Sequence, residues 1–273
     1  MNTHARSYLF VPGNRPERFD KAAASAADVV VLDLEDAVAE SAKADARERI
    51  VQWSARLDAQ ARSRIAVRIN VASSRHWGED LRLLRESRLG TVMLAKAEQA
   101  EQVVALVQAV PGVSVLPLLE TAGGVDACRA IAAAGGVARL VFGTLDYAVD
   151  LDLDLADDPQ PLADAAARIV LASRLAGRAA PVAGVTAQID DDARLASDWS
   201  WFRRRGFGAK LCIHPRQVEP VHAALAPDAA TLEWARRVVA ADAAGTGAAR
   251  VDGRMVDRPV VLQALRVLRR AGL

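Results

Sequence analysis

The chain has 273 residues, of which 52% are hydrophobic and 25% are charged. This composition excludes a disordered chain and suffices for one large α/β domain or two smaller ones. The 35 basic residues nearly balance the 34 acidic ones and leave a formal net charge of +1, which excludes a strong overall field that would attract nucleic acid or a membrane surface.

The cysteine count and the apolar runs predict a cellular location. The chain has two cysteines, Cys128 and Cys212, too few for a disulfide framework, so both are predicted to be buried free thiols in a reducing compartment. The first residues lack the apolar core of a signal peptide, and no apolar run reaches the roughly 18 residues that span a bilayer. We therefore expect a cytoplasmic protein with no membrane or nucleic-acid partner.

Short apolar runs, rich in β-branched residues, alternate along the chain with longer alanine-rich, charged segments. The runs are nearly continuous in apolar residues, which is typical of parallel strands covered on both faces. They predict eight strands, over residues 7–11, 29–34, 65–69, 91–95, 114–119, 139–142, 181–185 and 209–213.

The segments between the runs have the apolar spacing of helices. Eight strand–helix units in a chain of this length predict a (β/α)₈ barrel, which typically has about 250 residues. The alternative is an open doubly wound sheet, which usually carries a glycine-rich fingerprint after its first strand; the segment PGNRPERF does not match one. The predicted helices cover residues 15–26, 41–59, 98–110, 124–134, 162–178 and 191–205.

Two more helix-like stretches follow the eighth predicted strand, over residues 228–244 and 258–271. A glycine-containing link of small residues, 245–253, joins them. We therefore expect a barrel over residues 1–225 and a C-terminal helical extension over residues 226–273, which packs elsewhere or on a neighbouring subunit.

Charged residues end several of the predicted strands, and these ends carry the active site in a barrel. Glu120 and Asp146 each follow an apolar strand and precede a turn of small residues. Two carboxylates from neighbouring strands suit Mg²⁺, which takes the rest of its ligands from water and substrate. The four histidines have no zinc-ligand spacing. The alternative is that Glu120 and Asp146 only cap the helices that follow.

Arg68 is a charge inside the otherwise apolar strand AVRIN, so it must meet an anion. It either clamps a substrate carboxylate or developing oxyanion, or forms a structural ion pair with Glu35 or Glu120. Glu35 and Asp36 are adjacent and therefore point in opposite directions; we interpret them as outer supports that hold metal-bound waters.

Five further residues are candidates for a role in the site. Arg18 and Lys21 share a helix face after the first strand, which either binds phosphates or is simply solvated. Lys96 is a candidate Schiff-base lysine without a sign of a lowered pKa. His214 ends the eighth strand and is either an acid–base group or a structural hydrogen-bonding group. Asp257 precedes Arg258-Pro259, a pattern that favours an N-cap of the last helix.

Nine motifs, in order, resemble the citrate lyase β-subunit-like, CoA-ester lyase branch of the HpcH/HpaI aldolase/citrate lyase family, and the resemblance covers nearly the whole chain. Each motif alone is a weak signal, but nine in the right order are a strong one. They are RSYLFVPGNRPERFDKA (6–22), VVVLDLEDAV (29–38), the element from Lys43 to Arg47, VRIN (67–70), MLAKAE (93–98), LLETAGGV (118–125), VFGTLDYAVDL (141–151), GFGAKLCIHPRQV (206–218) and DGRMVDRPV (252–260).

The resemblance implies a barrel that assembles as a homotrimer or hexamer. It implies Mg²⁺-dependent cleavage of 3-hydroxy-acyl thioesters of coenzyme A, such as citramalyl, malyl, citryl or hydroxymethylglutaryl thioesters, to a keto acid and an acyl-CoA, or the reverse condensation. By motif, Glu120 and Asp146 are similar to the family's Mg²⁺ ligands, and Glu120 would also contact the substrate. The other implied roles are substrate-binding and catalytic for Arg68, outer-shell for Glu35 and Asp36, CoA phosphate binding for Arg18 and Lys21, and acid–base catalysis in a neighbouring subunit's site for Asp257.

The chain departs from the family pattern at three places. The usual Gly-Ala-Glu-Asp is here Gly143-Thr144-Leu145-Asp146, so a leucine replaces a pocket carboxylate. Gly123 stands where an arginine is frequent, and Ala183 stands where an aspartate is frequent. The metal ligands are kept but the rim is less charged, which affects the acyl substrate more than the reaction class.

Three functions are therefore considered. The first is a stand-alone CoA-ester lyase. The second is the β subunit of a citrate lyase complex, acting on a citryl thioester of an acyl carrier protein, which neighbouring genes for the other subunits would distinguish. The third is a non-catalytic barrel that serves as a binding or scaffolding subunit.

Overall fold

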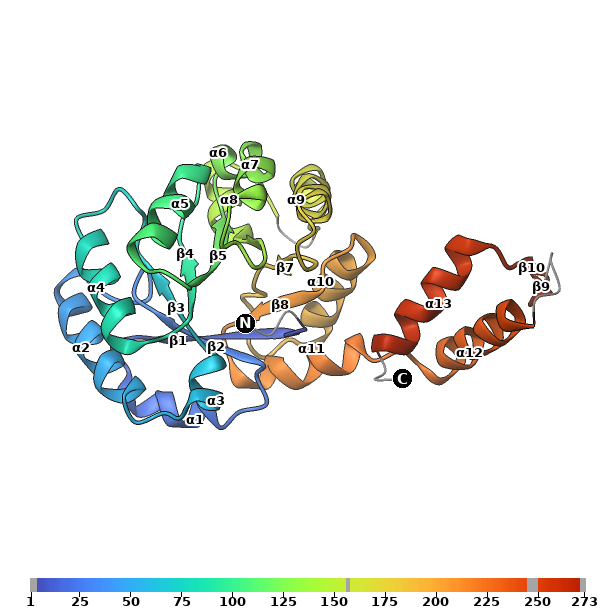
Figure 1. Ribbon diagram of the computed structural model, residues 1–273, viewed down its shortest axis with the longest axis horizontal. Helices are drawn as coiled ribbons and strands as arrows, with labels where there is room; N and C mark the ends of the chain where they lie inside the picture. Colours follow the sequence, from blue (N-terminus) through green and yellow to red (C-terminus); the bar gives the residue numbers. More distant parts are fainter. Residues whose placement is uncertain (1–3, 156–157, 245–249, 271–273) are drawn as a thin grey trace. The chain divides into compact units, whose positions relative to one another are not determined.

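The computed structural model describes residues 4–155, 158–244 and 250–270 (Figure 1). Eight parallel strands form a closed barrel in chain order, and β8 pairs with β1 to complete it. This confirms the predicted (β/α)₈ barrel. The strands are β1 (Ser7–Pro12), β2 (Val29–Asp33), β3 (Ile65–Ile69), β4 (Thr91–Leu94), β5 (Ser114–Leu119), β6 (Val141–Phe142), β7 (Val182–Ala183) and β8 (Ala209–Cys212).

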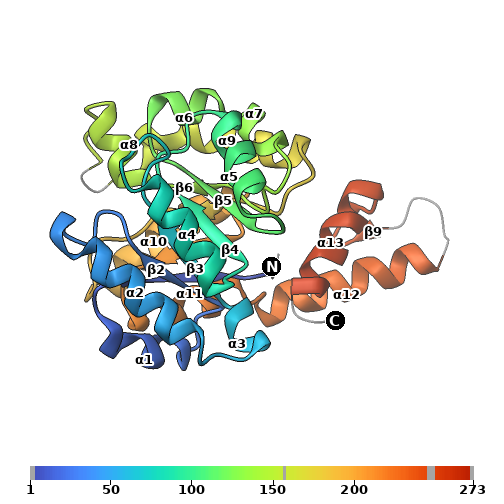
Figure 2. The ribbon, with the colours of Figure 1, turned by 60° about the vertical axis from the view of Figure 1, so that its left-hand side comes forward.

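Helices connect successive strands and cover the outside of the barrel (Figure 2). The α-helices of this part are α1 (Phe19–Ala23), α2 (Lys43–Ser54), α3 (Ala59–Ser63), α4 (Trp77–Ser87), α5 (Ala100–Ala109), α6 (Ala122–Asp126), α7 (Cys128–Ala133), α8 (Thr144–Asp150), α9 (Ala163–Leu175), α10 (Asp192–Arg204) and α11 (Val218–Leu225). Short 3₁₀ turns η1 (Pro16–Arg18), η2 (Glu40–Ala42), η3 (Gln160–Leu162) and η4 (Pro215–Gln217) precede α1, α2, α9 and α11.

Side-chain alternation along the strands explains why they are apolar throughout. On β2, Val29 and Val31 belong to the cluster of buried side chains that fills the barrel, while Val30 and Leu32 are fully buried on the other face. Successive residues of a strand point to opposite faces, and both faces of this sheet are covered. The same alternation directs Asp33, the last residue of β2, and Arg68 of β3 into the mouth of the barrel.

The sequence-based element boundaries need four kinds of correction. The sixth and seventh strands pair over two residues each, because regular pairing begins only at Val141 and Val182. The predicted helix over 15–26 divides into η1 and α1, and that over 124–134 into α6 and α7, while the helix predicted over 41–59 ends at Ser54 and α3 begins only at Ala59. The predicted helix over 162–178 ends at Leu175, before Gly177 adopts a positive φ of 66°. Helices α4, α8 and α11 were not predicted.

Residues His222–Leu273 form a second compact unit, and Met1–Val221 form the first, so the division falls inside α11. In the second unit α12 (Ala229–Ala243) and α13 (Arg258–Arg270) pack together around Ala235, Val238, Val261 and Ala264. A short antiparallel pair, β9 (Arg250–Val251) and β10 (Arg254–Met255), lies between the two helices in the chain. The predicted boundary between residues 225 and 226 lies four residues after this division, and the packing of the extension on a neighbouring subunit stays a prediction.

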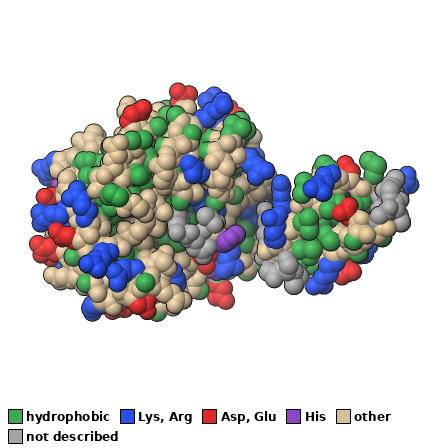
Figure 3. Space-filling model, in the orientation of Figure 1, with side chains coloured by type: hydrophobic (Ala, Val, Ile, Leu, Met, Phe, Trp, Pro, Cys, Tyr) green, Lys and Arg blue, Asp and Glu red, His purple; other side chains and the backbone are tan. Residues whose placement is uncertain are grey.

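The surface has the mixed charge expected from the composition. The face of the barrel unit drawn in Figure 3 carries acidic and basic side chains among each other rather than in one single-sign patch. Among the described residues, no helix combines the length and hydropathy needed to cross a bilayer. Cys128 and Cys212 are both buried free thiols, as predicted.

Lys210 is a fully buried lysine that the sequence did not single out. It lies on β8 between the inward-facing Ala209 and Leu211, and its ammonium donates to the carbonyl of Gly184 at 2.8 Å. The nearby Asp198 carboxylate is already bonded to Thr186 and Arg194. Because burial disfavours the charged form, the pKa of Lys210 falls to about 8.

We predict that the Lys210→Met variant loses a pH dependence of stability. The unfolded chain keeps the Lys210 proton up to about pH 10.5, whereas the native protein releases it near pH 8. The unfolding free energy of the wild type should therefore rise relative to the variant by about 1–3 kcal/mol between these pH values. Urea denaturation at pH 7, 8.5 and 10 measures this difference. The control is Lys21→Met, which removes an exposed lysine; its unfolding free energy should differ from that of the wild type by the same amount at all three pH values. A difference that does not change with pH for Lys210→Met would refute the prediction.

Candidate active site

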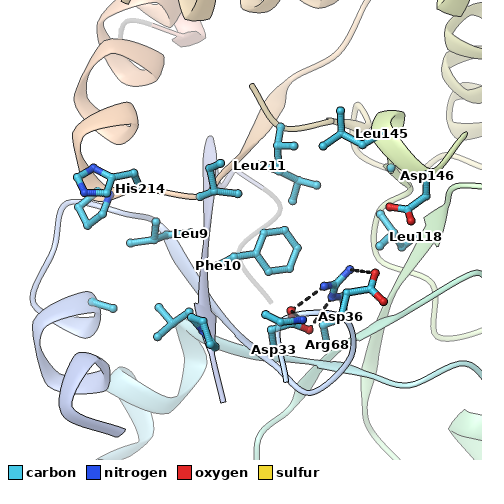
Figure 4. Close-up of a pocket in the computed structure, with 18 of the residues that line it drawn as sticks. Leu9, Phe10, Asp33, Asp36, Arg68, Leu118, Leu145, Asp146, Leu211 and His214 are labelled. Atoms are coloured by element: carbon cyan, nitrogen blue, oxygen red, sulfur yellow. Dashed lines mark hydrogen bonds and ion pairs between the residues drawn. The ribbon is translucent and has the colours of Figure 1, made fainter. Parts of the chain in front are cut away.

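A cavity of about 810 Å³ opens at the carboxyl ends of the barrel strands (Figure 4). Six of the residues predicted to form a site line it: Arg18, Lys21, Asp36, Arg68, Glu120 and Asp146. Glu35 is buried beside it and contacts Arg68. The ends of the strands therefore bring the predicted charges together, as the sequence analysis expected.

Arg68 is the best-bound charge of the cavity. Its Nε and Nη2 donate to the two carboxylate oxygens of Asp33 at 2.7 and 2.6 Å, and its Nη1 lies 2.8 Å from Oε2 of Glu35. Burial alone would lower the pKa of this guanidinium, but the hydrogen bonds and charge of Asp33 raise it above its ordinary value. The side chain therefore stays cationic and fixed in one orientation.

Asp33 is a functional residue that the sequence analysis missed. It stands opposite Arg68 in the parallel pairing of β2 with β3, so both side chains point into the barrel mouth. Its carboxylate also accepts the backbone N–H groups of Glu35 and Ala37, at 2.9 and 3.2 Å. Asp33 thus shapes the loop after β2 as well as holding Arg68. Its position within the apolar run VVVLD was the available signal.

A second set of buried charges supports this loop. The ammonium of Lys43 donates to the carbonyls of Leu34 and Glu35, at 2.6 and 2.9 Å, and to Oδ1 of Asn70 at 2.6 Å. The Asn70 amide in turn donates to Asp80 at 2.8 Å, and Asp80 pairs with Arg47 at 2.7 Å. The segments after β2 and β3 are thereby joined to α2 and α4, which fixes the surroundings of Glu35 and Arg68.

Lys96 contacts two buried carboxylates of the site, Glu35 and Glu120. Its Nζ binds Oε1 of Glu35, and its backbone N–H donates to Oε1 of Glu120 at 2.8 Å. Residue 96 has a positive φ of 46°, a strained conformation for a lysine, which places the amide toward Glu120. The ion pair with Glu35 outweighs the effect of burial and raises the pKa of Lys96. A raised pKa does not favour the Schiff-base interpretation.

Glu120 follows β5 and is only 1% exposed. Burial, with the repulsion of Glu35, raises its pKa to about 8, and the nearby Asp146 acts in the same direction. Gly143 lies so close that a Cβ atom there would stand 2.6 Å from Oε2 of Glu120. Any larger residue would displace the carboxylate, so Gly143 allows Glu120 to lie against the start of α8, where Asp146 stands.

The donor set of Glu120 and Asp146 fits a hard dication. Of the described residues, none donates a hydrogen bond to Oε2 of Glu120 or to the carboxylate of Asp146. The described chain also holds no cluster of three or more His, Cys, Asp or Glu side chains arranged to bind a metal. Two carboxylates with free oxygens suit Mg²⁺, which keeps waters and takes oxygens from the substrate.

The charge balance around Glu120 and Asp146 also favours the binding of a dication. The cavity and its edge hold more carboxylates than cations near the ends of strands β2 to β6, and burial makes this excess costly. A bound dication would relieve it. The carboxylates are Asp33, Glu35, Asp36, Glu120 and Asp146, and the cations are Arg68 and Lys96.

The remaining predicted residues have simpler surroundings. Arg18 and Lys21 are exposed at the edge of the cavity, and Asp36, with 58% of its side chain exposed, lies 3.9 Å from Arg68. His214 also lines the cavity. Its Nδ1 accepts the N–H of Arg216 at 3.2 Å, which favours the interpretation of His214 as a structural hydrogen-bonding group.

Asp257 caps α13 in the second unit. Its Oδ1 accepts the N–H of Val260 at 3.2 Å, in the N-cap arrangement that the sequence pattern favours. Asp257 is exposed. The cap uses one carboxylate oxygen and leaves the other free.

The sequence matches the family model of HpcH/HpaI aldolase/citrate lyase over residues 6–215. The chain belongs to this family. It is a family of aldolases and lyases, so the predicted family and the predicted enzyme class are confirmed.

Individual relatives cover nearly the whole chain. The citrate lyase subunit beta-like protein of Mycobacterium tuberculosis is 40% identical over 291 residues, which cover 100% of this chain and 98% of that protein. The (3S)-malyl-CoA thioesterase of Cereibacter sphaeroides is 32% identical over 271 residues, which cover 97% of this chain and 94% of that protein. The crystal structure of protein CitE from M. tuberculosis in complex with magnesium, acetoacetate and coenzyme A superposes with a TM-score of 0.89 at 39% identity, over 99% of this chain and 100% of that one.

We predict that Asp33→Asn destabilises the protein by about 2–4 kcal/mol, because it leaves the buried guanidinium of Arg68 with a weaker acceptor. The matched control is Asp36→Asn, a nearby carboxylate that is largely exposed and should change the unfolding free energy by less than about 0.5 kcal/mol. Urea denaturation compares the two variants with the wild type. Equal effects would show that the Asp33–Arg68 pair has no special role.

Proposed function

We propose that this protein is a Mg²⁺-dependent carbon–carbon lyase that cleaves a 3-hydroxy-acyl-CoA thioester to a keto acid and an acyl-CoA, or forms it in reverse. The observation that carries the proposal is the pair Glu120 and Asp146, whose free carboxylate oxygens meet in one cavity beside the fixed cation Arg68. The M. tuberculosis structure with magnesium, acetoacetate and coenzyme A supports the same classes of ligand.

Glu120 and Asp146 would hold the metal. When bound, Mg²⁺ polarises the carboxylate and hydroxyl oxygens of the substrate and stabilises negative charge on them. Gly143 and the Lys96 amide keep Glu120 in place, and the raised pKa of Glu120 reflects the charge that a dication would neutralise. Glu35 and Asp36 would accept hydrogen bonds from waters at the edge of the site.

Cleavage breaks the bond between the carbinol carbon and the α-carbon of the thioester. The hydroxyl loses its proton and becomes the ketone of the keto acid, while the bonding electron pair passes to the thioester enolate, which takes up a proton at carbon. Arg68 would stabilise the negative oxygen that develops in this step, since it is cationic and held by Asp33. Arg18 and Lys21, exposed at the edge of the cavity, would bind the phosphates of coenzyme A.

The proton for the enolate would come from Asp257 of a neighbouring subunit. We propose that the protein assembles as a homotrimer or hexamer in which the C-terminal extension reaches the next barrel. The free oxygen of the Asp257 carboxylate supports this role, because capping α13 and transferring a proton use different oxygens.

The direct test is a screen of CoA thioesters with Mg²⁺. Citramalyl-, malyl-, citryl- and hydroxymethylglutaryl-CoA are incubated with the protein, and keto acid, acyl-CoA and free thiol are measured separately. A lyase releases keto acid and keeps the thioester. Free CoA thiol without keto acid would indicate a thioesterase, the activity named for the C. sphaeroides relative, and would contradict the proposal. Cleavage of an acyl-carrier-protein thioester alone would favour the citrate lyase complex.

The Asp146→Ala variant tests the metal site. Asp146 is partly exposed in the first turn of α8 and accepts no hydrogen bond from the described residues, so its loss should leave the fold intact. We expect Mg²⁺ binding, measured by titration calorimetry, to weaken at least about 100-fold, because one of two protein ligands is gone. The control is Asp164→Ala, which removes an exposed carboxylate in the first turn of α9, outside the cavity lining. Unchanged Mg²⁺ affinity in Asp146→Ala would refute the assignment.

Subunit mixing tests the role of Asp257. Asp257→Ala and Asp146→Ala should each be inactive alone, and mixed oligomers should regain part of the activity, because some sites receive one intact barrel and one intact extension. Asp146→Ala is chosen over Arg68→Ala because loss of Arg68 would leave Asp33 and Glu35 without a buried cation. Mixed oligomers verified by mass spectrometry but without activity would exclude action between subunits.

A further inference from the structure

The cavity has a charged side and an apolar side. The charged side is formed by the ends of β2 to β5, where the carboxylates, Arg68 and Lys96 lie. In Figure 4 the apolar side chains of Leu9, Leu145 and Leu211 lie along the other side of the cavity, away from Arg68 and Asp33. The apolar members of the lining near β5 to β8 are Leu118, Leu145, Val185, Leu211 and Ile213, while Phe10 of β1 lies between the two sides, with the Arg68 guanidinium 5.0 Å from its ring centroid.

The apolar side begins at the metal ligands themselves. Leu145 directly precedes Asp146 on α8, and Leu118 lies two residues before Glu120 on β5. A Cβ atom at Gly143 would stand 3.3 Å from Leu118 and 2.6 Å from the Glu120 carboxylate, so these groups are close neighbours. A substrate held by Glu120 and Asp146 therefore has hydrocarbon surface within reach of its carbinol carbon.

Leu145 is 46% exposed although it lines the cavity. Covering an exposed leucine with an apolar group is favourable by about 25 cal/mol for each Å² of apolar surface removed from water. A carboxylate placed against it would instead lose solvation without gaining a partner. Leu145 therefore favours the binding of an alkyl group over that of a charged group at this place in the cavity.

Around Leu145, where the apolar side is formed by the ends of β5 to β8, the described lining holds no lysine or arginine that would receive a second substrate carboxylate. The cations of the described lining are Arg18 and Lys21 at the edge, after β1, and Arg68 across the cavity, where it is held by Asp33 and lies beside Glu35. The polar members of the apolar side are Thr144 and His214, and Nδ1 of His214 accepts the Arg216 N–H.

We propose that this side of the cavity binds an alkyl substituent on the carbinol carbon, and that Leu145 is its main specificity determinant. The substrate is then a 3-hydroxy-acyl thioester whose carbinol carbon carries one carboxylate, the hydroxyl and an alkyl group, and the keto acid is an alkyl 2-oxo acid such as pyruvate. A carboxymethyl group, which would give oxaloacetate, is disfavoured. This inference rests on the proposed lyase function.

The test compares thioesters that differ only in this substituent: methyl, ethyl or carboxymethyl. With Mg²⁺ present, we expect kcat/KM for the alkyl compounds to exceed that for the carboxymethyl compound at least about tenfold. Equal or higher kcat/KM for the carboxymethyl compound would overturn the inference while leaving the lyase function standing. Absence of cleavage of all three would count against the lyase function itself.

Binding provides a readout that does not need turnover. Titration calorimetry with Mg²⁺ should show tighter binding of pyruvate and 2-oxobutyrate than of freshly prepared oxaloacetate. This measurement still decides the inference if cleavage is not detected, because it depends only on how the cavity receives the substituent. Tighter binding of oxaloacetate would overturn it.

Leu145→Lys places a cation on the apolar side and should lower the alkyl preference at least about tenfold, chiefly by raising kcat/KM for the carboxymethyl compound. The matched control is Val149→Lys, one turn further along α8, 83% exposed and outside the cavity lining, which should leave the preference unchanged. Leu145→Met keeps an apolar side chain and should also preserve it. An equal effect of the two lysine variants would show that Leu145 does not act through the cavity.

Discussion

The active-site end of the barrel depends on one buried interaction, the two-point pair between Arg68 and Asp33. The pair exists because β2 and β3 align residues 33 and 68 as neighbours and because both side chains face inward. A guanidinium in such a position is stable only when its donors are occupied, so the pair fixes Arg68 and, through the backbone of Glu35 and Ala37, the loop after β2. The chemistry of the mouth is built on this fixed point.

The buried network beneath the mouth explains how the charges stay in place without filling the cavity. Lys43 and Asn70 join the loops after β2 and β3, and the Arg47–Asp80 pair anchors Asn70 to the outer helices. Hydrogen bonds between buried polar groups give a rigid arrangement, and among the described atoms of this network only Nη2 of Arg47 has no hydrogen-bond partner. Glu120 and Asp146 differ from this network, since their free oxygens face the cavity and remain available to a ligand.

The sequence predicted the barrel and most of its strands because continuous apolar runs reflect burial on both faces. β3 and β5 have the predicted bounds, while the short β6 and β7 do not, since pairing there depends on neighbouring strands and not on the run itself. Arg68, Glu120 and Asp146 were identified as charges at strand ends. Asp33 was missed because its importance comes from the register of β2 against β3, which a single sequence does not contain.

Leu145 shows how a departure from a family pattern acquires physical meaning only in the structure. In the sequence it signals a lost carboxylate; in the fold it continues an apolar side that Leu118 and Leu211 already form inside the barrel. One side of the cavity therefore carries charged side chains that are either paired with one another or available to a metal, and the other side carries apolar side chains. A site divided in this way orients a substrate by its two unlike ends, because turning it around would place an alkyl group among carboxylates and an anion against leucines. The division itself is thus a source of orientation, independent of any single hydrogen bond.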